Sequence, residues 1–192
     1  MRTELIVIGT SWGGLRALQM LLRDLPPNLG CPVLVAQHRA ADGESDLATV
    51  LGRASVLPVC DAADKDQLVG GRVYLAPADY HLMVEEKWCV ALSTSAPVHS
   101  ARPSIDVLFD TAAAAYGAAV AGVVLTGASA DGASGLAAIQ RAGGAVIVQD
   151  PSTAECPIMP QAAVAATWTP VVLPLEGIAS HLARLTGGGV LS

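Results

Sequence analysis

The chain has 192 residues, of which 52% are hydrophobic and 15% charged, and 17 acidic against 11 basic side chains give a net charge of −6. A chain of this size buries a core as one domain without disulfides or a metal, which excludes a disordered tail or a fibrous repeat. Aromatic residues make up 4% and basic residues form no run, so a nucleic-acid-binding surface is also excluded.

The predicted elements alternate between short apolar runs and helical patterns. Predicted strands are 5–8, 33–36, 73–76, 120–125 and 145–148, and predicted helices lie at about 14–24, 44–54, 104–116 and 133–142, with two more at 161–166 and 175–185. Near-continuous apolar strands between helices are typical of a parallel sheet covered on both faces. We therefore expect one domain over 1–192, a doubly wound, mostly parallel α/β fold. Residues 81–84 and 88–92 add a small antiparallel hairpin at about 80–92.

Neither cofactor nor membrane insertion is predicted. The four cysteines are scattered with no C-x-x-C pair, so neither a zinc site nor a redox dithiol is indicated, and no metal or other cofactor is expected. Residues 111–130 are uncharged over membrane-spanning length. Gly117 nevertheless divides them into an alanine-rich helix end and a β-branched strand. With no signal peptide at the N-terminus, we expect a cytoplasmic protein.

The first predicted strand leads into Gly9-Thr10-Ser11-Trp12-Gly13 and then a helix. This pattern fits G-x-S-x-G, a sharp turn that lifts a serine hydroxyl clear of the sheet. A dinucleotide cradle would require glycine where Ser11 stands, and no G-K-[ST] of a phosphate loop follows. The alternative that stays open is an ordinary glycine-rich turn with an incidental serine.

Two further strand ends carry residues that can assist a serine nucleophile. His38 follows the second strand and Asp131 follows the strand at 120–125. The carboxyl ends of parallel strands share one rim, so His38 can serve as general base to Ser11. Asp131 can accept the Nδ1–H of His38, or it can cap the helix that begins just after it. The sequence alone leaves both open.

At this point the chain resembles the catalytic domain of the CheB family of chemotaxis protein-glutamate methylesterases. The matching segments are Ile8 to Gly14, Gln37-His38, Val73 to Pro77 with His81, Arg102 to Phe109, Val124 to Ala133, Gln149-Asp150 and Met159-Pro160, in the family's order. The resemblance implies a serine hydrolase with Ser11 as nucleophile, His38 as general base and Asp131 orienting it. It also implies γ-methyl glutamyl esters on the cytoplasmic helices of chemoreceptors as substrate, glutamate and methanol as products, and deamidation of some receptor glutamines.

Backbone N–H groups of Trp12 and of the 127–129 turn, Ala128 in particular, are the expected oxyanion donors. The family usually has threonine at Trp12 and Met-Gly at Ala128-Ser129, so we expect Trp12 to be either a hydrophobic plug or a substrate contact. Arg102 and Asp106 are expected to shape and cap the helix beginning near Ser104. The family's receiver domain does not fit into 192 residues, which implies a stand-alone enzyme or an excised domain.

Two alternative functions stay open. One is a catalytically silent regulatory or binding module that keeps the fold, and the other is a hydrolase whose protein substrate lies outside chemotaxis. The sequence does not indicate an oligomeric state.

Overall fold

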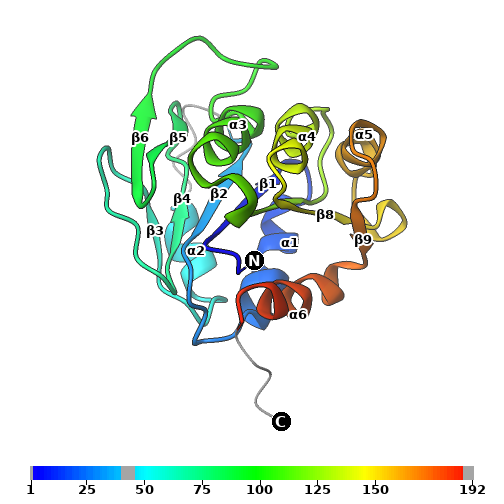
Figure 1. Ribbon diagram of the computed structural model, residues 1–192, viewed down its shortest axis with the longest axis horizontal. Helices are drawn as coiled ribbons and strands as arrows, with labels where there is room; N and C mark the ends of the chain where they lie inside the picture. The colour runs from blue at the N-terminus through cyan, green and yellow to red at the C-terminus, as the bar shows by residue number, and fades with distance from the viewer. Residues whose placement is uncertain (1, 40–45, 188–192) are drawn as a thin grey trace.

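The computed structural model describes residues 2–39 and 46–187, and its centre is a seven-stranded, fully parallel sheet (Figure 1). The strand order is β3-β4-β2-β1-β7-β8-β9. The strands are β1 (Leu5–Thr10), β2 (Val33–Gln37), β3 (Val59–Asp61), β4 (Val73–Leu75), β7 (Val120–Val124), β8 (Ala145–Gln149) and β9 (Val171–Leu173).

Helices cover both faces of this sheet, so the predicted doubly wound α/β fold is confirmed (Figure 1). On one face lie α1 (Gly14–Asp24), α2 (Leu47–Gly52) and α6 (Leu175–Leu185), and on the other lie α3 (Ile105–Tyr116), α4 (Ala133–Arg141) and α5 (Ile158–Ala166). Two short 3₁₀ turns occupy Gly117–Ala119 and Pro151–Thr153. The first two residues of the helix predicted at 44–54 lie outside the described residues.

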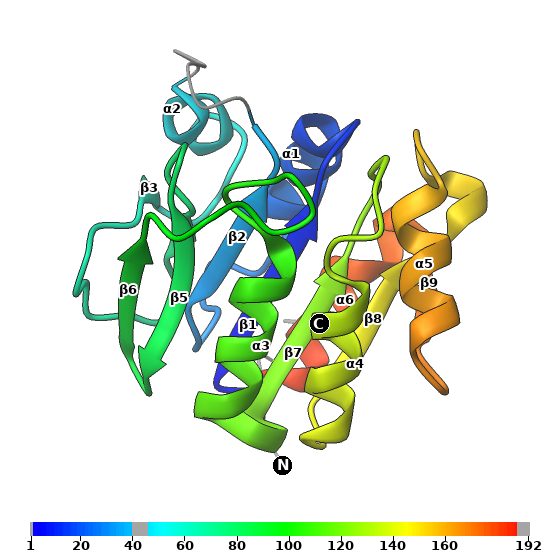
Figure 2. The ribbon, with the colours of Figure 1, turned by 90° about the horizontal axis from the view of Figure 1, so that it is seen from above.

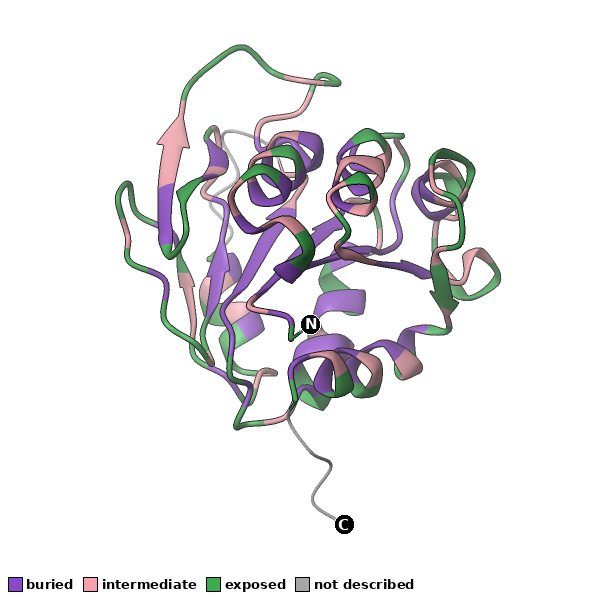
Figure 3. Ribbon diagram, viewed as in Figure 1, coloured by how far each residue is buried: buried purple, intermediate pink, exposed green. Residues whose placement is uncertain are grey.

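The inner strands of the sheet are largely buried from both sides, as Figure 3 shows by their purple colour. All six residues of β1 are buried. Leu5 and Val7 pack in the core under α3 and α4, whereas Ile6 and Ile8 pack in the core under α1 and α6. This burial on alternate faces explains why the strands read as continuous apolar runs rather than as alternating ones.

An antiparallel hairpin of β5 (His81–Glu86) and β6 (Cys89–Ser93) flanks α3, which confirms the predicted hairpin. Its turn is at Lys87 and Trp88, and Trp88 adopts a left-handed φ of 69°. The Tyr116 hydroxyl accepts the Trp88 N–H at 2.9 Å, so α3 anchors the turn.

The segment at 111–130 divides between the end of α3 and β7, as predicted. Among residues 2–39 and 46–187, no helix is both long and apolar enough to cross a membrane.

The topology brings the predicted site residues to one edge of the sheet. β1 pairs with β2 on one side and with β7 on the other. The chain builds one half of the sheet after β1 and the other half after α3, so β1 and β7 form the switch point at which α/β proteins commonly bind ligands. Ser11, His38 and Asp131 follow β1, β2 and β7, and Figure 2 shows these three loops along one edge.

Candidate active site

Ser11 and His38 are fixed by backbone hydrogen bonds that continue the sheet beyond the strand ends. The Ser11 N–H donates to the carbonyl of Thr126 at 3.0 Å, and the His38 N–H donates to the carbonyl of Thr10 at 3.1 Å. Both residues are partly accessible. The sheet therefore sets the positions of the predicted nucleophile and base.

His38 is hydrogen-bonded to Asp131, with 2.7 Å between its Nε2 and the carboxylate Oδ2. The prediction that Nδ1 makes this bond is wrong. The ring therefore faces the carboxylate with Nε2, which leaves Nδ1 without this partner. The side chain of Asp131 is fully buried, whereas 16% of the His38 side chain is exposed.

Asp131 also caps a helix, but not the one that follows it. Its carboxylate accepts the N–H groups of Ile105 at 2.7 Å and Asp106 at 2.9 Å, and the hydroxyl of Ser104 donates to it at 2.9 Å. The two N–H groups lie in the first turn of α3, where backbone donors have no acceptor within the helix. The interpretation that Asp131 caps its own helix is wrong, because its carboxylate bonds to the start of α3 and the N-cap residue of α4 is Gly132, with a φ of 93°.

Asp106, which lies on α3, caps the start of α4 in turn. Its Oδ1 accepts the N–H groups of Gly132 at 2.9 Å and Gly135 at 2.7 Å, at the start of α4. The expectation that Asp106 caps the helix beginning near Ser104 is therefore wrong, and the Ser104 side chain fills that position. α3 and α4 thus exchange carboxylate caps, an arrangement between distant segments that no local pattern shows.

The environment of Asp131 favours its ionised form. Burial is the largest single influence and raises its pKa. The hydrogen bonds from His38 and from the backbone of Asp106 and Ile105 together outweigh burial and hold the pKa of Asp131 below its usual value. At Asp106 burial prevails and raises the pKa, and the neighbouring charge of Asp131 adds to the rise.

The turn after β7 lies directly against the serine. A Cβ added to Gly127 would lie 3.0 Å from the Cβ of Ser11 and 2.7 Å from the sulfur of Met159, so a side chain there would press on Ser11 and displace the end of Met159. Within the described residues, no hydrogen bond joins the Ser11 hydroxyl to the His38 ring. Catalytic hydrogen bonds of this kind are often long in the free enzyme and tighten when substrate binds.

Two of the expected oxyanion donors are available. The N–H groups of Trp12 and Ala128 have no acceptor among the described residues, whereas the N–H of Gly127 is taken by the carbonyl of Cys156 at 3.1 Å. The Trp12 side chain is 66% exposed, which excludes the hydrophobic plug.

Thr126 joins the loop after β1 to the segment around Cys156, a role that the sequence did not indicate. Its hydroxyl donates to the carbonyl of Trp12 at 2.9 Å and accepts the N–H of Cys156 at 2.8 Å. Its own N–H donates to Oε1 of the buried Gln149 at 2.9 Å, and its carbonyl accepts the Thr10 hydroxyl at 2.8 Å. These hydrogen bonds connect the Ser11-Trp12 turn to the end of β7 and to β8.

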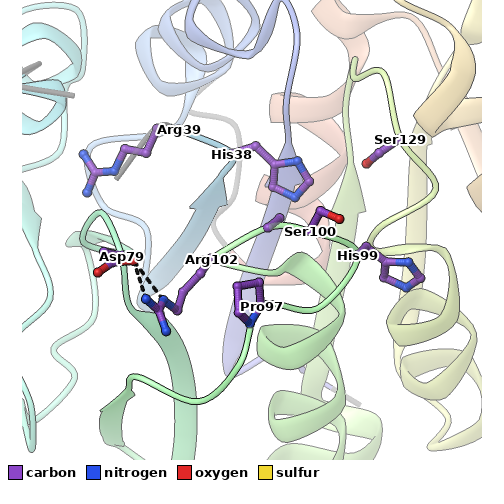
Figure 4. A pocket seen from close by; sticks show the side chains of 9 residues that line it. His38, Arg39, Asp79, Pro97, His99, Ser100, Arg102 and Ser129 are labelled. Atoms are coloured by element: carbon purple, nitrogen blue, oxygen red, sulfur yellow. Dashed lines mark hydrogen bonds and ion pairs between the residues drawn. The ribbon is translucent and has the colours of Figure 1, made fainter. Parts of the chain in front are cut away.

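A cavity of about 500 Å³ opens beside His38 (Figure 4). It is lined by His38, Arg39, Asp79, Pro97, His99, Ser100, Ala101, Arg102 and Ser129. Arg102 pairs with Asp79, with 3.0 Å between Nε and Oδ1, and donates to the carbonyls of Thr94 and Ser95 at 2.8 and 3.0 Å. Arg102 therefore braces this loop, and the expectation that it caps α3 is wrong.

Comparison with known proteins decides the family. The family model described as CheB methylesterase matches residues 6–182. The chain belongs to the CheB methylesterase family. A solved structure, the CheB methylesterase catalytic domain of Thermotoga maritima, matches with a TM-score of 0.90 at 34% identity, covering 96% of this chain and 100% of that chain.

Relatives of this CheB family member differ in length. A protein of Leptospira interrogans named as a protein-glutamate methylesterase/protein-glutamine glutaminase is 42% identical, with 96% of both chains covered. A protein of Anaeromyxobacter dehalogenans with the same activity in its name is 43% identical over 96% of this chain, but over only 54% of its own length. The chain thus spans nearly all of the first relative and about half of the second.

Two further histidines in this CheB-family site support Asp131 and Asp106. His81, predicted to belong to the hairpin, begins β5 and is buried, and its Nδ1 accepts the N–H of Ser104 at 3.1 Å. His99, which had no assigned partner, lies 3.1 Å from Asp106. His99, Asp106 and Asp131 bring potential metal ligands within 4.8 Å of one another. Both Asp131 oxygens and Oδ1 of Asp106 already accept two hydrogen bonds each, as caps rather than as open ligands.

Proposed function

We propose that this protein is a cytoplasmic serine hydrolase that demethylates γ-methyl glutamyl esters on chemoreceptors, releasing glutamate and methanol. The observation that carries the proposal is the His38–Asp131 hydrogen bond at 2.7 Å, which joins the loops after β2 and β7 on either side of β1, the strand that Ser11 follows. The names of the relatives support the substrate and add the related deamidation of receptor glutamines.

In the first step, the Ser11 hydroxyl oxygen attacks the ester carbonyl carbon while Nδ1 of His38 takes the hydroxyl proton. The tetrahedral intermediate then expels methoxide, which leaves with that proton as methanol. The glutamyl group stays bound to Ser11 as an ester. The proton is thereby returned and His38 is neutral again.

In the second step, a water molecule repeats the sequence. His38 takes a proton from the water, hydroxide adds to the acyl carbon, and the Ser11 oxygen leaves with the proton. The products are a free glutamate side chain and the restored serine. For deamidation the same steps apply, with ammonia leaving in place of methanol.

Asp131 supports both steps through its charge. Its carboxylate stays ionised because four donors satisfy it, and His38 becomes positively charged each time it holds the proton. A fixed negative charge 2.7 Å from the ring stabilises that imidazolium and orients the ring. The Trp12 and Ala128 N–H groups would bind the developing oxyanion, a contribution worth on the order of hundredfold in rate.

We assign residues 1–192 to one catalytic domain, with the cytoplasmic helices of methylated chemoreceptors as partner. The relatives' names favour this function over a catalytically silent module of the same fold, and over a hydrolase with a substrate outside chemotaxis.

The experiment is methanol release from a methylated chemoreceptor cytoplasmic fragment. Ser11→Ala is expected to lower the rate by a factor on the order of a thousand or more. Ser134→Ala, which removes an exposed serine on α4, is the matched control and should leave the rate unchanged. Full activity of Ser11→Ala would refute the serine mechanism.

A further inference from the structure

The largest exposed apolar side chain at the active-site edge belongs to the residue directly after the nucleophile. Trp12 exposes 66% of its surface, although its own carbonyl is held by Thr126 at 2.9 Å. An indole offers a large apolar contact area with little conformational freedom to lose on binding. The backbone of Trp12 is thus anchored, and its indole is left uncovered.

Trp12 is joined by other exposed apolar residues. Ile158, at the start of α5, is 51% exposed, and Ala128 is also exposed. The carbonyl of Gly127 accepts the N–H of Met159 at 2.9 Å, so the start of α5 and the turn of Trp12 are both attached to the Thr126-Gly127 pair. We call Trp12, Ala128 and Ile158 the apolar shelf; they come from the loops after β1 and β7 and from the start of α5.

The other side of the site carries charged side chains among apolar ones such as Pro97 and Ala101. The cavity beside His38 is lined by charged residues such as Arg102 and Asp79 and contains none of the shelf residues. The strand order explains the division, because His38 follows β2 on one side of β1, whereas the shelf draws on the loops of β1, β7 and α5. A substrate in this site therefore meets the exposed indole of Trp12 on one side and a cavity with charged side chains on the other, a contrast that suits an amphipathic helix.

Helical geometry sets which substrate residue reaches the shelf. Side chains three or four residues apart lie on one face of a helix, separated by one turn of about 5.4 Å. Consecutive Cα atoms such as those of Ser11 and Trp12 are about 3.8 Å apart. A helix whose axis runs along the direction from Ser11 to Trp12 would therefore place the side chain one turn away over Trp12 when its ester-bearing side chain enters at Ser11.

We propose that Trp12 is a specificity-determining residue that packs against an apolar side chain located one helical turn from the methyl ester. The occupant of the shelf is thus the amphipathic helical segment that carries the ester. The inference rests on the proposed function and adds a sequence preference to it.

The test is a binding cycle in the Ser11→Ala background, where the substrate is not consumed. The probe is a fluorescent helical peptide with one γ-methyl glutamyl ester and a leucine one turn away, and its dissociation constant is measured by anisotropy. Trp12→Ala is expected to weaken binding by about tenfold. Trp12→Phe should restore most of the affinity, and Trp168→Ala, which removes an indole that is 57% exposed, should have no effect.

A second peptide, with serine in place of the leucine, completes the cycle. Its affinity should be nearly the same for Trp12 and for Trp12→Ala, because the contact is already lost. Equal loss with both peptides, or a Trp12→Ala effect below about twofold, would overturn the proposal. If the wild-type enzyme releases methanol from the leucine peptide and the cycle shows no coupling, only the proposed role of Trp12 is refuted. If the wild-type enzyme releases no methanol from this peptide, the proposed function is refuted, and the role of Trp12 with it.

Discussion

A methyl group added at Gly9 tests how the fold positions His38 and Asp131, the proposed catalytic pair. Gly9 lies in β1, two residues before Ser11, and a Cβ at this position would overlap Cγ2 of Ile105 and lie 3.1 Å from its Cγ1. Ile105 is fully buried, so its side chain has no open space to enter. Gly9→Ala therefore has to push the first residue of α3 away from the sheet.

A displacement of Ile105 would reach His38 through one oxygen of Asp131. Oδ2 of Asp131 accepts both the N–H of Ile105 and the ring nitrogen of His38, each at 2.7 Å. Overpacking of this kind costs about 1–3 kcal/mol of stability. A shift on the order of 1 Å near reacting groups can lower the rate by about a hundredfold. We expect Gly9→Ala to show both effects.

The assays are urea denaturation and the rate of methanol release. The matched control is Gly52→Ala, since a Cβ there has only one neighbour, Val59, at 3.9 Å. Gly52 ends α2, where alanine is neutral or stabilises by up to about 1 kcal/mol. If Gly9→Ala were as stable and as active as the control, the proposed coupling between β1, α3 and His38 would be refuted.

Three further predictions concern buried groups. Asp131→Asn leaves two of four donors without an acceptor, so we expect a loss of about 3 kcal/mol by urea denaturation and of roughly three to four orders of magnitude in kcat. Wild-type activity would contradict it. Since the folded-state pKa of Asp131 is lowered, its contribution is present above the unfolded value of 3.8 and is lost as pH falls through the folded pKa. As pH falls from 3.8 through the folded pKa, stability should therefore fall less steeply in Asp131→Asn than in wild type. Burial raises the pKa of Cys31 to about 12, so this thiol should react with a thiol reagent at about pH 8 only after unfolding, and rapid labelling of the folded protein would show the opposite.

The sequence predicts the long elements well and the short ones poorly. The bounds of α1 and α6 agree with those expected, because each has a clear apolar stripe and defined ends. β3 and β9 have three residues each and lie at the edges of the sheet, and they were not predicted as strands. Three residues carry too little periodicity to distinguish a strand from a loop.

At the site, the sequence indicates which residues meet but not how they are held. Ser11, His38 and Asp131 could be brought to one edge because parallel strands share a rim. The capping of α3 by Asp131 depends on contacts more than twenty residues apart along the chain, and no local motif encodes them. For the same reason, Thr126 and the brace formed by Arg102 and Asp79 were not foreseen.

The most direct test of the account is to trap the acyl-enzyme. The protein is mixed with a γ-methyl glutamyl peptide, quenched in acid within one turnover and digested with trypsin, whose fragment of residues 3–16 contains Ser11 as its only serine. If Ser11 is the nucleophile, this fragment gains the mass of the glutamyl peptide less methanol, and the gain disappears in Ser11→Ala. Methanol release with no modification of fragment 3–16 would contradict the central claim that Ser11 is the nucleophile.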